Sequence, residues 1–210
     1  MINENLNKVI RYFGIGLLIT FITGFIAKEY MIKIIYGTPL YLVLIVAMLA
    51  ISIILPVRIH KMEATTAQIL YYLYTALTGL TFSSIFIVYE ISSIIYIFLA
   101  TSIIFIIFGL LGSKTKIDLT KITPYLLIGL FSIIILEIIN AIFLKNVGLD
   151  MGLCILSIII FIAYVAYDIQ KISRINIDNE AYAVIGAFEL YLDFINIFIN
   201  LLRLFGRERD

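Results

Sequence analysis

The chain has 210 residues, of which 63% are hydrophobic and only 14% are charged, and its mean hydropathy is +1.12. A soluble domain is nearer half apolar and a quarter charged, so this composition indicates an integral membrane protein. The net charge of +1 argues against nucleic acid as the main partner, and the single cysteine excludes a disulfide framework.

In chain order, seven apolar stretches are long enough to cross the hydrocarbon layer as helices, each of which needs about 20 residues. The predicted spans cover residues 9–27, 36–57, 66–89, 91–111, 122–144, 149–170 and 181–205. A tight turn at Glu90, Ser92 and Ser93 separates the third span from the fourth, because Glu90 is the only charge between residues 66 and 111. These continuous runs lack the alternation of a membrane barrel. We therefore predict one all-α domain over residues 1–210 with seven transmembrane helices.

The distribution of lysine and arginine predicts the orientation of these spans. With seven spans, nine of the basic residues fall on the side of the N-terminus and six on the other side. Positive residues favour the cytoplasm, so we expect the N-terminus inside. A count of six spans with a partly inserted last segment would instead gather twelve basic residues, together with both ends, inside. That alternative stays open.

The last predicted span contains five polar residues at spacings of four, three, four and three, which puts them on one helix face. They are Glu189, Asp193, Asn196, Asn200 and Arg203. Ionisable groups at membrane depth normally face a bundle interior or a water-filled cavity, so we expect the other six helices to enclose this one. Hydrogen bonds between helices explain Asn196 and Asn200 more simply. That explanation does not require an ionisable group such as Asp193.

A second acid, Asp168, ends the sixth span, and a hairpin brings it toward the last helix and Asp193. Two carboxyl groups a few Å apart in low dielectric cannot both ionise easily, so we expect one proton to be held at a raised pKa. Such a pair is a proton sensor. Arg58 ends the second span on the same predicted side as Asp168, and a nearby arginine favours the charged form. The simpler alternatives are a salt bridge of Asp168 with Lys171 and a positive-inside anchor at Arg58.

The remaining polar residues of the spans carry weaker signals. Glu137 and Asn140, one turn apart in the fifth span, could line a cation path, although Glu137 could equally snorkel. We expect His60 to be a solvated loop residue and Cys154 to fill space in the core. The sequence has no Walker loop, HExxH, Gly-rich dinucleotide turn or GxSxG, and its single histidine disfavours a zinc site built from histidines.

Two segments resemble the Bax inhibitor-1 family, also called transmembrane Bax inhibitor motif proteins. They are residues 164–172, YVAYDIQKI, and residues 190–203, LYLDFINIFINLLR. The bacterial members that leak calcium in a pH-dependent way are the most similar. The resemblance implies a seven-helix fold with a central last helix, a di-aspartyl pH sensor at Asp168 and Asp193, and a basic partner at Arg58. Where some relatives have an acid in the second span, this chain has Ile45 or an apolar neighbour.

The expected function is therefore a pH-sensitive passive calcium leak channel in the plasma membrane of a bacterium. Its partners would be the lipid bilayer, calcium ions and protons, with no cofactor other than the transported ion. Hard cations prefer oxygen ligands, which makes Asp168 and Asp193 candidate calcium contacts. Two rivals stay open. One is an intramembrane enzyme that uses paired aspartates, and the other is a regulatory survival or stress protein that acts through membrane partners.

Overall fold

The computed structural model of the chain describes residues 4–35, 39–174 and 179–209. Within them, seven helices are long and apolar enough to cross a membrane, which confirms the all-α prediction of seven spans. These helices cover Leu6–Tyr30, Leu40–Lys61, Ala64–Val88, Ile91–Lys114, Leu119–Leu144, Val147–Arg174 and Glu180–Phe205. The predicted start of the second span, at residue 36, lies outside the described residues.

The helices extend past several predicted span ends. Helix α1 (Glu4–Ile35) runs beyond both ends of the predicted 9–27 span. The reason is that lysine and glutamate end an apolar stretch but are good helix formers. The predicted turn before the fourth span was partly wrong. Ser92 and Ser93 lie in the first turn of α5 (Ile91–Lys114), and the chain breaks at Tyr89 and Glu90 instead. Serine suits the start of a helix as well as a turn.

The chain forms two compact units that share the last helix, α8 (Glu180–Phe205). Unit 1 comprises Met1–Ile91, Asn176–Tyr191 and Glu208–Asp210, and unit 2 comprises Ser92–Ile175 and Leu192–Arg207. The single domain over residues 1–210 stays a prediction.

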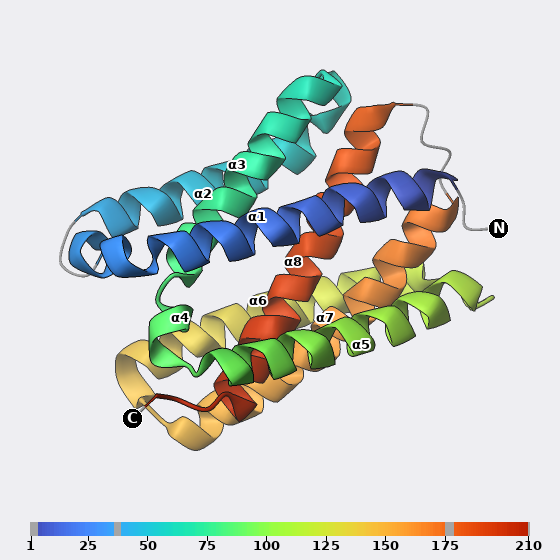
Figure 1. Cartoon of the computed structure of the whole chain (residues 1–210). Coiled ribbons are helices and arrows are strands. Elements are labelled where there is room, and N and C mark those ends of the chain that lie inside the picture. The colour runs from blue at the N-terminus through green and yellow to red at the C-terminus, as the bar shows by residue number, and fades with distance from the viewer. Residues whose placement is uncertain (1–3, 36–38, 175–178, 210) are drawn as a thin grey trace. The chain divides into compact units, whose positions relative to one another are not determined.

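Unit 1 is built around helix α3, which packs along α1 and against α2 (Figure 1). Its further elements are α2 (Leu40–Arg58), η1 (Ile59–Lys61), α3 (Ala64–Phe82) and α4 (Ile85–Val88). Helices α1 and α3 cross where Gly79 meets Thr20, because a Cβ built on Gly79 would lie 2.6 Å from the Thr20 carbonyl oxygen. Small residues at such a crossing allow two backbones to approach closely in a membrane.

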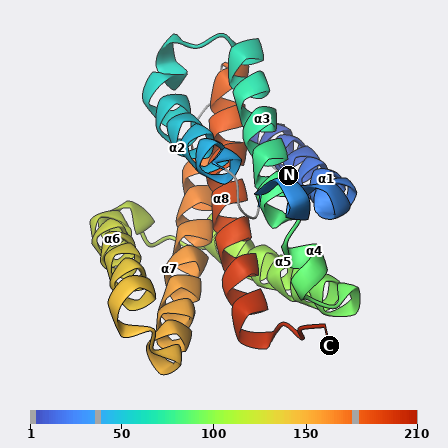
Figure 2. The same cartoon turned by 90° about the vertical axis from the view of Figure 1, so that its left-hand side faces the viewer.

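In unit 2, helices α6 and α7 lie side by side as a hairpin (Figure 2). Its elements before α8 are α5, η2 (Leu119–Ile122), α6 (Thr123–Ile139), the π-helical turn η3 (Asn140–Leu144) and α7 (Val147–Arg174). Helix α5 approaches α7 at Gly112, where a Cβ would lie 2.1 Å from the Ala166 carbonyl oxygen. Phe98 and Phe105 of α5 pack edge to face on Phe194 of α8.

Helix α8 has the largest buried share of the seven spans. Leu190 and Tyr191 are fully buried in unit 1, and Ile197 is fully buried in unit 2. Its enclosure by all six other helices stays a prediction.

Candidate functional site

The two acids predicted to form a proton sensor both lie in unit 2 and are both buried. Asp168 lies on α7 and is 5% exposed, and Asp193 lies on α8 and is 4% exposed. Both act electrostatically on the phenol of Tyr164, so the two carboxyl groups converge on one region of unit 2. We call Asp168 and Asp193 the aspartate pair. A hydrogen bond between the two carboxyl groups stays a prediction.

The asparagines of the α8 stripe bond to their own helix. The Asn196 side-chain amide donates to the Leu192 carbonyl at 2.7 Å, and the Asn200 amide donates to the Asn196 carbonyl at 2.8 Å. This places the two amides one above the other along α8. Asn200 is 6% exposed, and its Oδ1 atom accepts no hydrogen bond from the residues that the structure describes. The stripe thus brings amide oxygens, suitable for a hard cation, to the buried part of α8.

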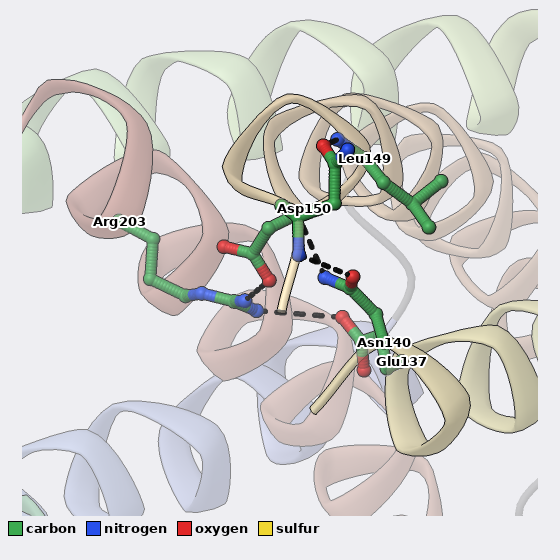
Figure 3. A network of polar contacts seen from close by, with 6 residues as sticks. Glu137, Asn140, Leu149, Asp150 and Arg203 are labelled. Atoms are coloured by element: carbon green, nitrogen blue, oxygen red, sulfur yellow. Dashed lines mark hydrogen bonds and ion pairs between the residues drawn. The ribbon is translucent and has the colours of Figure 1, made fainter. Parts of the chain in front are cut away.

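Arg203, the last residue of the stripe, holds two acids from other helices (Figure 3). Its Nη1 atom donates to Glu137 Oε1 of α6 at 3.3 Å, and its Nη2 atom donates to Asp150 Oδ1 of α7 at 2.5 Å. We call these three residues the Arg203 network. The side chains of these three residues are 34–41% exposed. The network therefore links α6, α7 and α8 through two ion pairs.

Glu137 and Asn140, predicted as candidates for a cation path, both make polar contacts within unit 2. Glu137 pairs with Arg203, and Asn140 closes the link between α6 and α7. The Asn140 side chain accepts a hydrogen bond from the Asn146 amide at 2.9 Å and donates to the Asn146 carbonyl at 3.1 Å. A path for cations along these two residues stays a prediction.

The other end of α7 is tied to the link that follows α5. Gln170 is 3% exposed, and its amide donates to the Ile117 carbonyl at 2.9 Å while it accepts from the Leu119 amide at 3.0 Å. Asp118 accepts hydrogen bonds from Thr120 and lies 3.8 Å from Arg174. Hydrogen bonds from Thr120, and secondarily the charge of Arg174, hold the pKa of Asp118 below its ordinary value. Gln170 lies two residues from Asp168 and so anchors the part of α7 that carries this member of the aspartate pair.

Arg58 and Glu189, the remaining candidates, lie in unit 1. Arg58 is the last residue of α2 and is exposed, and Glu189 is half-buried on α8. The action of Arg58 on Asp168 stays a prediction. His60 is exposed as expected, but its Nδ1 atom lies 2.7 Å from the Tyr182 hydroxyl, so it links η1 to the start of α8.

A resident metal site is not visible in the described part of the chain. No group of three or more histidine, cysteine, aspartate or glutamate residues there could hold a metal ion. Cys154 is 1% exposed, as expected for a residue that fills space in the core.

Sequence reasoning missed three residues of the site. Asp150 forms one of the two ion pairs of Arg203, Gln170 anchors α7, and the phenol of Tyr164 is under the electrostatic influence of the aspartate pair. The sequence could have indicated Tyr164, because it precedes Asp168 by four residues and that spacing puts two side chains on one helix face. The partners of Asp150 and Gln170 are distant in sequence, so no local pattern indicated them.

Seven apolar helices with buried acids define a polytopic α-helical membrane protein. Residues 2–210 match the family model described as "Inhibitor of apoptosis-promoting Bax1". The chain therefore belongs to the Bax inhibitor-1 family, and the resemblance carried by residues 164–172 and 190–203 is confirmed.

Relatives cover nearly the whole chain. The "Inner membrane protein YbhL" of Escherichia coli K12 is 37% identical over 96% of this chain and 91% of its own length. An uncharacterized protein of Borreliella burgdorferi is 36% identical over 99% of this chain and 94% of its own. The uncharacterized protein RP147 of Rickettsia prowazekii is 31% identical over 97% and 89%. None of these three names describes an enzymatic activity.

Proposed function

We propose that this protein is a passive calcium leak channel of a bacterial inner membrane and that protonation of the aspartate pair opens it. The observation that supports the proposal most directly is the burial of two carboxyl groups that act on one tyrosine within unit 2. Acids at membrane depth are costly and mark ion or proton pathways. Membership of the family and the relative named as an inner membrane protein support the same reading.

The gating step is a change in the charge of the aspartate pair. Near neutral or higher pH, an ionised Asp168 maintains the closed state of the channel. Acidification protonates the aspartate pair, and the channel then opens. A shift of one pKa unit corresponds to about 1.4 kcal/mol, which changes the ratio of open to closed protein tenfold. A modest proton-linked change is therefore sufficient for a switch. Arg58 favours the ionised form in this scheme, so its loss acts in the same direction as protonation.

The test is calcium entry into dye-loaded liposomes that contain only the purified protein, measured between about pH 6 and 8. Wild-type protein should leak more at the acidic end. Asp168→Asn mimics the protonated state, so its leak should be high and nearly independent of pH, and Arg58→Ala should change in the same direction. Asp118→Asn is the matched control, because Asp118 lies outside the spans, and it should keep the wild-type response.

Flux in the same assay separates a channel from both alternative functions. A regulatory protein that needs membrane partners gives no flux in liposomes with the purified chain alone. An enzyme that uses the aspartate pair also gives no flux and loses its activity in both Asp168→Asn and Asp193→Asn. If Asp168→Asn keeps the wild-type pH response, the switch lies at another acid, and Glu137 and Glu189 are the next to test.

A further inference from the structure

The hydroxyl of Tyr164 is a buried donor that the structure leaves unused. Its oxygen is shielded from solvent and makes no hydrogen bond to any residue that the structure describes. The ring packs beside Phe161, at 6.2 Å between centroids, on a helix long and apolar enough to span the membrane. A polar group at that depth normally has a partner, because hydrocarbon offers none. Tyr164 therefore needs an acceptor within unit 2.

Carboxyl groups are the acceptors that act electrostatically on this phenol. Asp168 follows Tyr164 by four residues and so lies on the same face of α7. The charged and titratable groups that act on the phenol are Asp168 and Tyr167 of α7 and Asp193 of α8. An ionised carboxylate accepts hydrogen bonds more strongly than a neutral acid does. The phenol is thus under the influence of carboxyl groups that accept a hydrogen bond more strongly when they are ionised.

We propose that Tyr164 is the third member of the proton sensor, and that its hydroxyl donates a hydrogen bond to the ionised form of the aspartate pair. The bond favours the charged form and so lowers the pH at which the pair takes up its proton. Tyr164 is a positioning residue that sets the working range of the sensor. The consequence for calcium flux rests on the proposed function, whereas the consequence for titration of the acids does not.

The sign of the effect follows from the charge that the bond stabilises. Tyr164→Phe removes the donor and keeps the ring, so the ionised pair loses support and protonates at a higher pH. A tenfold change in proton affinity moves the midpoint by about one pH unit, and that is the size of the upward shift we expect. In the leak assay the channel should then open at correspondingly less acidic pH.

The decisive measurement is the infrared carboxyl band of the purified protein in lipid, followed against pH. Asp168→Asn and Asp193→Asn assign the band to the aspartate pair. Tyr125→Phe is the matched control, because Tyr125 is 75% exposed on α6, and its midpoint should equal that of the wild type. An unchanged or lowered midpoint in Tyr164→Phe overturns the proposal.

A second variant protects the test against a folding defect. Fluorotyrosine at position 164 keeps the hydroxyl and makes it a stronger donor, so the midpoint should move downward, opposite to Tyr164→Phe. Shifts in the same direction for both variants contradict the proposed bond. If wild-type liposomes show no pH-dependent leak while the infrared midpoints shift as expected, the proposed function fails and the role of Tyr164 stands.

Discussion

At the scale of single residues, Asp118 illustrates how the ends of the helices in unit 2 are held. Its Oδ1 atom accepts hydrogen bonds from the Thr120 amide at 3.1 Å and the Thr120 hydroxyl at 2.8 Å. These bonds lower the pKa of Asp118 in the folded protein. A lowered folded-state pKa gives stability that is present above the unfolded value, about 3.9, and is lost as the pH falls through the folded value.

Asp118→Asn should therefore make the stability of the protein less dependent on pH in the acidic range. The amide cannot titrate, so the variant should lose less stability than the wild type between about pH 5 and pH 2. The measurement is the thermal unfolding midpoint in detergent at several pH values. Asp150→Asn serves as a comparison, since Asp150 pairs with Arg203 outside this turn. If the unfolding midpoints of the wild type and Asp118→Asn depend on pH in the same way, the hydrogen bonds from Thr120 do not contribute to the pH dependence of stability.

The sequence predicted which polar residues share a helix face, but not which residues of other helices they contact. Helical spacing was sufficient to place Asp193, Asn200 and Arg203 on one face of the last helix, because local geometry sets that pattern. It could not show that Arg203 pairs with Glu137 and Asp150, which are 66 and 53 residues away. Such pairings depend on how the helices pack.

At the scale of elements, the crossing of α5 and α7 depends on the absence of a side chain at Gly112. A Cβ there would lie 2.1 Å from the Ala166 carbonyl oxygen, and that oxygen belongs to backbone that cannot move aside alone. Gly112→Ala should force the helices apart, break the packing near Asp168, and lower the unfolding midpoint by several degrees, as a loss of about 1–3 kcal/mol would.

Gly152→Ala is the control for this prediction. Gly152 also lies in a spanning helix of unit 2, and nothing lies within 4 Å of an added Cβ. Alanine favours a helix over glycine, so this variant should be neutral or slightly more stable. Differential scanning fluorimetry in detergent measures both. Equal midpoints for the two variants would mean that α5 and α7 separate without cost.

The number of helices was predictable, and their ends were less so. A run of about 20 apolar residues has few alternatives in a membrane, which is why seven spans could be counted from hydropathy. Hydropathy reports where lipid begins and ends, whereas a helix ends where its backbone bonds stop. This difference accounts for the longer α1, and the short helix α4 was missed because its four residues belong to the same apolar run as α3.

At the scale of the whole molecule, α8 is the element that both units share. It contributes Tyr191 to unit 1 and Asp193 to unit 2, with one residue between them. In unit 1 the Tyr191 hydroxyl lies 2.6 Å from the Thr20 hydroxyl, whose oxygen also donates to the Thr75 carbonyl. A helix is stiff over such a short distance. Adjacent turns of α8 thus carry a polar contact of unit 1 and a buried acid of unit 2.

The orientation of the whole chain is predicted by its basic residues, and it can be tested with introduced cysteines. Cys154 is buried, so Cys154→Ala gives a background without reactive thiols. Lys116→Cys lies in the link between α5 and α6, and Arg209→Cys lies near the C-terminus; both side chains are exposed. With seven spans and the N-terminus inside, the two positions lie on opposite sides of the membrane.

A maleimide that cannot cross membranes should therefore label Arg209→Cys in intact cells, and label Lys116→Cys only after the cells are permeabilised. Six spans with a partly inserted last segment would protect both positions until permeabilisation. Labelling of Lys116→Cys alone in intact cells would reverse the orientation and place the N-terminus outside. In that case the end of α7 that carries Asp168 would face the exterior, and external rather than cytoplasmic acid would open the leak.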